Sequence, residues 1–175
     1  MIRNEPEFSG NEGKIDSMQN APKGLRLQIG VFGKRNAGKS SILNVLARQK
    51  VSIVSDTPGT TTDPVEKAME MLPLGPVLFI DTAGLDDCGE LGLMRIERSR
   101  KMIERTDLAL IVSPQGRWDS LEENLLTEFL ARKTPVIVVF NKSDLGEPPA
   151  ELVARLDREK VPHVTLSAAE KTGFE

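Results

Sequence analysis

Cysteine and histidine are almost missing from this sequence of 175 residues, which contains one of each. A single cysteine, Cys88, cannot form an internal disulfide and cannot build a four-cysteine metal site within the chain. The single histidine, His163, excludes a histidine-rich metal site. Neither residue type therefore gives this chain a metal cluster of its own.

Long apolar segments are missing as well. The longest apolar run is PVIVVF, Pro135–Phe140, which is far too short to span a bilayer. Residues 1–16 lack the apolar core of a signal peptide. We therefore expect a cytoplasmic protein without a membrane partner.

Charge of one sign does not dominate either, because 23 basic and 26 acidic residues leave a net charge of −3. This balance gives no electrostatic reason to expect nucleic acid as a partner. The content of hydrophobic residues, 39%, and of charged residues, 28%, is ordinary for a globular protein. The length suits one compact domain.

The first part of the chain differs from the rest. Residues 1–24 are polar, with scattered glycine and proline and no apolar period, so we expect a flexible tail. Met18 could be the natural start, with an expression leader before it. The domain itself is expected over residues 25–175.

From residue 25 onward, predicted strands alternate with predicted helices. This order indicates βαβ units and a largely parallel sheet with helices on both faces. Ligands of such sheets bind beyond the carboxyl ends of the strands, where the polar motifs of this chain lie. The predicted strands are 25–33, 65–72, 76–81, 108–113, 135–140 and 162–167, and the predicted helices are 39–48, 93–106, 121–133 and 150–160.

The strongest motif is GKRNAGKS, Gly33–Ser40, which follows a predicted strand and precedes a predicted helix. The glycines let the backbone curl so that several N–H groups face one phosphate, and the helix N-terminus adds a partial positive charge. Lys39 can reach the β- and γ-phosphates, and Ser40 can place its hydroxyl on Mg²⁺. We therefore predict a phosphate-binding loop.

A second motif, DTAG, begins at Asp81 directly after a buried strand. A carboxylate at a strand tip can hold Mg²⁺, commonly through water. The Gly84 N–H can contact a γ-phosphate and so sense its presence.

The third motif, NKSD, Asn141–Asp144, follows the run PVIVVF. The Asp144 carboxylate can accept two hydrogen bonds from the N1–H and N2–H₂ edge of guanine. Adenine has no donors there, so the motif favours GTP over ATP. The segment SAAEKTG, from Ser167, could contact the base with backbone amides.

This ordered set of motifs resembles the P-loop GTPases over nearly all of residues 25–175. The resemblance implies a Ras-like fold with a mostly parallel six-stranded sheet. Since the chain stops at Glu175, we expect it to lack most of the last helix and to be a truncated GTP-binding domain.

Within the GTPases, RNAGKSSILNVL and VSIVSDTPGTTTDPV resemble the bacterial branch of tRNA-modification and ribosome-assembly GTPases. The runs GTTTDPV, GPV and DTAGLDDCGELG resemble more narrowly the GTPase domain of the FeFe-hydrogenase maturation family, HydF. The RNA-linked relatives usually carry arginine where Thr62 stands. The narrower resemblance implies a switch in hydrogenase cluster maturation, and the alternative is a GTPase of tRNA modification or ribosome assembly.

Further partners follow from the narrower resemblance. In that family the protein continues into a dimerisation domain and an iron–sulfur-cluster domain, and radical-SAM maturases and the hydrogenase are the implied protein partners. With Cys88 alone, this chain cannot carry the family's cluster.

The resemblance also implies slow hydrolysis of GTP to GDP and phosphate, with Thr61 placing its hydroxyl on Mg²⁺ and its N–H on the γ-phosphate. Leu85 stands where many GTPases carry a water-orienting glutamine. Water would then be oriented by the backbone of residues 55–61 or by Asp86, Asp87 or Glu90.

A K⁺ ion is implied beside the phosphates. In the related bacterial GTPases an asparagine at the place of Asn36 binds K⁺ together with main-chain carbonyls of the first switch, here those of Ser55 and Thr57. The alternative is that Asn36 is only a favourable turn residue.

The expected site residues fall into three groups. Those expected to act in catalysis are Lys39, Thr61, Gly84 and Asn36. Mg²⁺ is expected on Ser40, Thr61 and Asp81. Residues expected around the nucleotide are Gly33, Asn36, Ala37, Gly38, Lys39, Ser40, Ser41, Thr57, Thr60, Thr61, Asp81, Gly84, Asn141, Lys142, Asp144, Ser167, Ala168 and Ala169.

Overall fold

The computed structural model describes residues 26–48, 52–57, 65–71, 74–82 and 100–174. The predicted N-terminal tail, residues 1–24, lies outside them. The strands are β1 (Leu27–Phe32), β2 (Ser52–Thr57), β3 (Val65–Met71), β4 (Gly75–Asp81), β5 (Leu108–Pro114), β6 (Val136–Asn141) and β7 (His163–Thr165).

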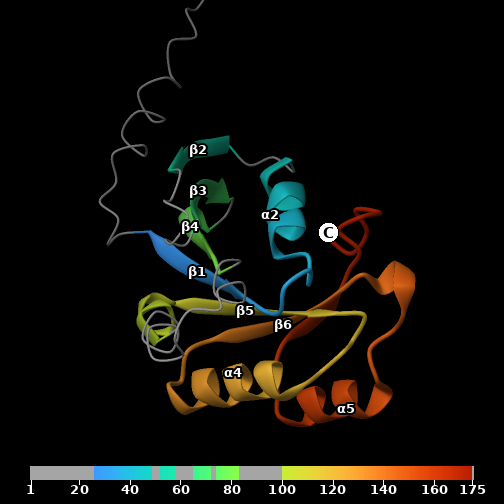
Figure 1. Ribbon diagram of the computed structural model, residues 1–175. Coiled ribbons are helices and arrows are strands. Elements are labelled where there is room, and N and C mark those ends of the chain that lie inside the picture. The colour runs from blue at the N-terminus through green and yellow to red at the C-terminus, as the bar shows by residue number, and fades with distance from the viewer. Residues whose placement is uncertain (1–25, 49–51, 58–64, 72–73, 83–99, 175) are drawn as a thin grey trace, which may run out of the picture.

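These strands form one sheet in the order β2-β3-β4-β1-β5-β6-β7 (Figure 1). The pairs β2–β3 and β3–β4 are antiparallel, whereas β4, β1, β5, β6 and β7 run parallel to one another. Asp81, the last residue of β4, pairs in register with Val31 near the end of β1. The carboxyl ends of the parallel strands therefore meet at one edge of the sheet, which is where ligands of such sheets bind.

Helices lie on both faces of the sheet. The helix α2 (Lys39–Arg48) covers one face, and α4 (Ser120–Ala131) and α5 (Ala150–Arg158) cover the other (Figure 1). A short 3₁₀ helix, η3 (Ser143–Leu145), follows β6, and residues 100–105 are helical. None of the helices in the described part of the chain is long and apolar enough to cross a membrane.

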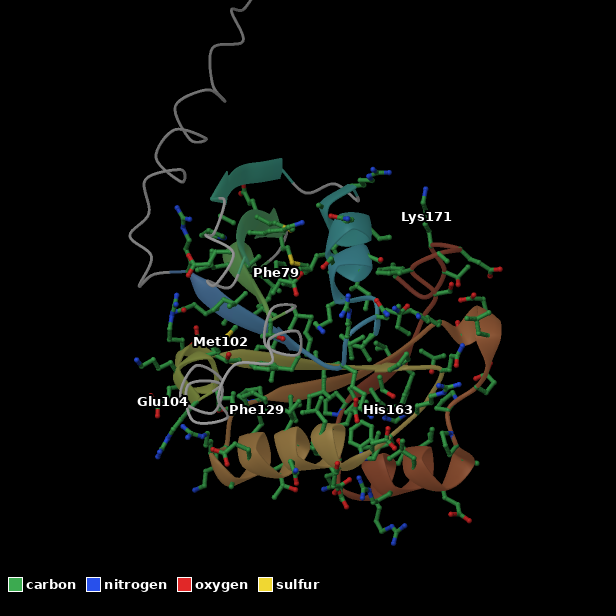
Figure 2. All side chains as sticks on the ribbon, in the orientation of Figure 1. Phe79, Met102, Glu104, Phe129, His163 and Lys171 are labelled. Atoms are coloured by element: carbon green, nitrogen blue, oxygen red, sulfur yellow. The ribbon has the colours of Figure 1, made fainter. Side chains whose placement is uncertain are left out.

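Alternating strand residues build a separate hydrophobic core on each face. On the α2 side, Ile29 and Val31 of β1 pack with Leu43 of α2. On the other side, Phe32 packs with Phe129 of α4, and their ring centroids are 5.0 Å apart. Figure 2 shows Phe129 between α4 and the sheet and Phe79 on the side of α2. The two cores hold the strand ends that carry the polar motifs.

The predicted fold class is confirmed, and each of the six predicted strands is present. The sheet contains one strand more, β2, which pairs antiparallel with β3 through Ser55↔Ala68 and Thr57↔Glu66. The sequence analysis assigned Ser55 and Thr57 to the first switch and predicted no strand there, and the structure corrects this for Ser55–Thr57. Pairing with β3 satisfies backbone groups that would otherwise lie on an open sheet edge. Residues 58–64 lie outside the described residues.

The core on the α4 side generates a stability prediction. Replacing Phe129, which is fully buried, by alanine should lower the free energy of unfolding by about 3–5 kcal/mol, because a ring is lost and a cavity is left. Replacing its neighbour Leu130, which is 45% exposed, should cost less than about 1 kcal/mol. Chemical denaturation of both variants measures the difference, and equal losses would contradict the assignment of this core.

Candidate functional site

The loop between β1 and α2 owes its shape to two glycines. Gly33 has a φ of 141°, and a Cβ atom there would lie 2.3 Å from the carbonyl oxygen of Val112. Gly38 has a φ of 93°, and a Cβ atom there would lie 2.1 Å from Nδ2 of Asn141. Any other residue at either position would meet both backbone strain and a clash. The spacing of these glycines therefore fixes a curled loop immediately before the first turn of α2.

Lys39 lies inside that curl and is 5% exposed. Its ammonium donates hydrogen bonds to the carbonyl oxygens of Gly33, at 2.5 Å, and Lys34, at 2.9 Å. The helix α2 begins at Lys39, so the positive end of its dipole adds to this charge. The loop thus presents a cation and backbone donors to an anion such as a phosphate.

A pocket of about 470 Å³ opens at this loop. Arg35 and Asn36 are exposed there, and Asn36 has a left-handed φ of 60°, as asparagine tolerates in a turn. The pocket is lined by Arg35, Asn36, Gly38, Lys39, Ser40, Ser41 and Lys142.

Ser40 and Asp81 meet, although they come from different elements. The Ser40 hydroxyl, in the first turn of α2, donates a hydrogen bond of 2.7 Å to Oδ2 of Asp81 at the end of β4. A hydroxyl and a carboxylate are the hard oxygen ligands that Mg²⁺ prefers. Among the described residues no group of three or more His, Cys, Asp or Glu side chains could hold a metal ion by itself. The pair therefore fits a Mg²⁺ that completes its coordination with phosphate oxygens and water.

The side chain of Asn141 connects the phosphate loop with the segment after β7. It is 2% exposed, its Nδ2 donates to the carbonyl oxygen of Ala37 at 2.8 Å, and its Oδ1 accepts from the N–H of Ala168 at 3.1 Å. One buried amide thus sets the spacing between two halves of the site.

Asp144, which the sequence assigns to the base, is held by Ser167. The Ser167 hydroxyl donates a hydrogen bond of 2.5 Å to Oδ1 of Asp144. Ser167 is fully buried, whereas Asp144 is exposed in the middle of η3. Ser143 N–H also donates to the carbonyl oxygen of Leu166 at 3.2 Å. A carboxylate fixed in this way can receive the two donors of a guanine edge, as the sequence predicts.

The structure brings most of the expected residues to one edge of the sheet. One group of expected residues lies elsewhere in the sheet, and another lies outside the described part of the chain. Ser55 and Thr57 lie in β2, which β3 and β4 separate from β1. The remaining expected residues, Thr60, Thr61 and Gly84, lie outside the described part of the chain, as do Leu85, Asp86, Asp87, Cys88 and Glu90. Ala169 is described and is exposed in the turn after Ala168.

The sequence analysis missed one charged cluster near the site. Lys34, in the phosphate loop, forms an ion pair with Asp119 immediately before α4 and lies near Glu122. The spacing Asp119-x-x-Glu122 is a capping-box signal and could have marked the start of α4. Its pairing with Lys34 has no local signal, because the partners are 85 residues apart.

The fold and this arrangement define the class of a P-loop nucleotide-binding domain. The family described as 50S ribosome-binding GTPase matches residues 28–142. The chain belongs to this family, and it is a GTP-binding GTPase domain with a Ras-like fold.

Named relatives agree with this assignment. The chain is 37% identical to GTPase Der of Wolinella succinogenes, over 90% of this chain and 35% of the relative. It is 39% identical to the tRNA modification GTPase MnmE of Syntrophotalea carbinolica, over 87% of this chain and 32% of the relative. The chain therefore spans about a third of the length of these relatives.

Solved structures show the same fold. Era of Aquifex aeolicus bound to GDP·AlF₄⁻ is 31% identical, with a TM-score of 0.58 over 82% of this chain and 51% of that one. The G domain of the T. maritima FeoB iron transporter is 20% identical, with a TM-score of 0.61 over 85% of this chain and 91% of that one. At that identity the second likeness concerns the fold alone.

The buried ammonium of Lys39 generates a binding prediction. Lys39→Ala should raise the dissociation constant for GTP more than about a hundredfold, because a charge-assisted contact to phosphate is lost. Calorimetric or fluorescence titration measures it, with Lys133→Ala, an exposed lysine beyond the end of α4, as the matched control. Micromolar affinity retained by Lys39→Ala would overturn the phosphate-loop assignment.

Proposed function

We propose that this domain is the GTP-driven switch of a larger protein and that it hydrolyses GTP slowly to GDP and phosphate. One observation carries the proposal: the phosphate loop, the Ser40–Asp81 pair and the Asp144–Ser167 pair lie along the carboxyl ends of the parallel strands of one sheet. Phosphates, a divalent cation and a guanine base are the three parts of Mg²⁺-GTP, and each has a complementary group here.

Phosphoryl transfer is mainly positioning and neutralisation of charge on phosphate oxygens. Lys39 and the loop N–H groups would neutralise the β- and γ-phosphates, while Ser40 and Asp81 would hold Mg²⁺. When bound, Mg²⁺ supplies further positive charge at the phosphate oxygens. Asp144 would orient the base. Thr61 and Gly84 remain our predicted contacts to the γ-phosphate, and the group that orients water remains a choice between the backbone of residues 55–61 and the carboxylates that follow Leu85.

We also propose that K⁺ assists hydrolysis through Asn36. Asn36 is exposed at the rim of the phosphate pocket, so its amide oxygen is accessible to an ion beside the phosphates. Ser55 and Thr57 lie in β2, two strands beyond β4. Their carbonyls remain our predicted partners for the ion.

This proposal predicts a dependence on the monovalent cation. Replacing K⁺ by Na⁺ at constant ionic strength should slow GTP hydrolysis several-fold or more, because a positive charge beside the developing transition state is lost. Phosphate release measures the rate, and Asn36→Ala should remove the difference between the two ions. Equal rates of the unchanged protein in K⁺ and Na⁺ would eliminate the K⁺ site.

Two processes are candidates for the whole protein. The names of the relatives, a tRNA modification GTPase among them, favour tRNA modification or ribosome assembly. The runs GTTTDPV and DTAGLDDCGELG, with Thr62 in place of the usual arginine, favour maturation of the FeFe-hydrogenase cluster. The comparisons support the RNA-linked process better than the maturation process. Radical-SAM maturases, attached dimerisation and iron–sulfur domains, and a cytoplasmic location remain predictions of the narrower resemblance.

A pull-down that depends on the nucleotide state separates the two processes. The purified chain, loaded with GDP or with a non-hydrolysable GTP analogue, is offered purified radical-SAM maturases, tRNA-modification partners and ribosomes. Retention of the maturases in one nucleotide state supports cluster maturation, and retention of ribosomes or tRNA-modification partners supports the alternative. With Lys39→Ala the dependence on nucleotide should disappear. Retention of none in either state would contradict a direct contact of this domain with the partners of either process.

A further inference from the structure

Lys34 ties the phosphate loop to the start of α4. Its ammonium donates a hydrogen bond to Oδ2 of Asp119, and its Nζ lies 3.6 Å from Oε2 of Glu122. Lys34 occupies the second position of the phosphate-loop motif, where any residue is allowed. The phosphate-binding chemistry therefore does not explain why a lysine here points at another helix.

Glu122 makes this contact more than a surface ion pair. Its side chain is fully buried. Oε2 accepts a hydrogen bond of 3.1 Å from the N–H of Asp119, whereas Oε1 has no hydrogen-bond partner among the described residues. A buried carboxylate is strongly unfavourable unless a cation lies close to it. Lys34 is the cation that the phosphate loop supplies to Glu122.

The backbone of the same lysine orders the phosphate loop. The carbonyl oxygen of Lys34 accepts hydrogen bonds from Nζ of Lys39, at 2.9 Å, and from the N–H of Ala37, at 3.1 Å. The hydrogen bond with Asp119 raises the pKa of the Lys34 ammonium, and the charge of Glu122 adds to this effect. The side chain therefore remains charged at neutral pH, while its own carbonyl orients the phosphate-binding ammonium.

We propose that Lys34 is a positioning residue and that Lys34, Asp119 and Glu122 form a tether that slows nucleotide release. The tether fixes the Lys34 carbonyl relative to α4 and so fixes the direction of the Lys39 ammonium. The first turn of α4, which contributes no residue to the phosphate pocket, thereby becomes part of the nucleotide site. The inference rests on the phosphate-loop assignment and is independent of the process that the protein serves.

The competing explanation is that these charges serve only the stability of the fold. Two variants separate the explanations. Lys34→Met removes the ammonium and leaves Glu122 buried without its cation, so it should lower stability under either explanation. The double variant Lys34→Met/Glu122→Gln removes the uncompensated charge as well, and a glutamine oxygen can still accept from the N–H of Asp119.

The test measures the dissociation rate of fluorescent GDP from the purified chain, with the unfolding midpoint recorded for each variant. We expect Lys34→Met to release GDP about tenfold faster than the unchanged protein. In the double variant we expect the unfolding midpoint to recover while GDP release stays about tenfold faster than in Glu122→Gln alone. As a matched control, Arg132→Met breaks the ion pair of Arg132 Nε with Glu128 Oε1, 2.6 Å apart at the other end of α4, and should change release less than twofold.

Each outcome decides the question. If the double variant releases GDP at the same rate as Glu122→Gln, the tether proposal is wrong and Lys34 has a purely structural role. That comparison stands even if Lys34→Met alone does not fold, because the double variant buries no unpaired charge. An unchanged protein that fails to bind fluorescent GDP would instead refute the phosphate-loop assignment itself.

Discussion

The nucleotide site depends on the two hydrogen bonds of the Asn141 side chain. This buried amide, at the last residue of β6, donates to the carbonyl of Ala37 in the phosphate loop and accepts from the N–H of Ala168 after β7. Its position also requires Gly38, since a Cβ atom there would collide with Nδ2. A replacement lacking either the donor or the acceptor would leave a buried polar group unpaired. The Asn141 side chain thus fixes the distance between the phosphate loop and the segment after β7. It also requires a glycine at position 38 of the phosphate-loop motif.

The sheet places Asn141 close to the segments that its side chain connects. Parallel strands bring the ends of β1, β4 and β6 to one edge, and the cores on both faces hold them there. Ser40 meets Asp81 at this edge, and Asp144 meets Ser167 beside it. The groups expected to bind phosphate, metal and base are therefore built on strand ends and helix starts, which suits a site that must keep its geometry.

The fold class and the phosphate loop could be predicted from the sequence because their signals are local. Apolar strands alternate with amphipathic helices, and the whole phosphate-loop motif lies in one uninterrupted stretch, Gly33–Ser40. The strand β2 escaped prediction because its sequence, SIVSDT, is mostly polar, with Ile53 and Val54 as its apolar residues, and its pairing with β3 decides its conformation. Contacts between distant segments escaped as well. Lys34 pairs with Asp119 across 85 residues and Asn141 with Ala37 across 104, and periodicity does not encode such pairs.

Selection of guanine tests the account most directly, because it needs the phosphate loop and the Asp144–Ser167 pair in one site. Competition titrations of the unchanged chain with GDP and ADP, in the presence of Mg²⁺, measure this selection. The account predicts that GDP binds at least about a hundredfold more tightly, since adenine offers no donors to the Asp144 carboxylate. Equal affinities for GDP and ADP would contradict it.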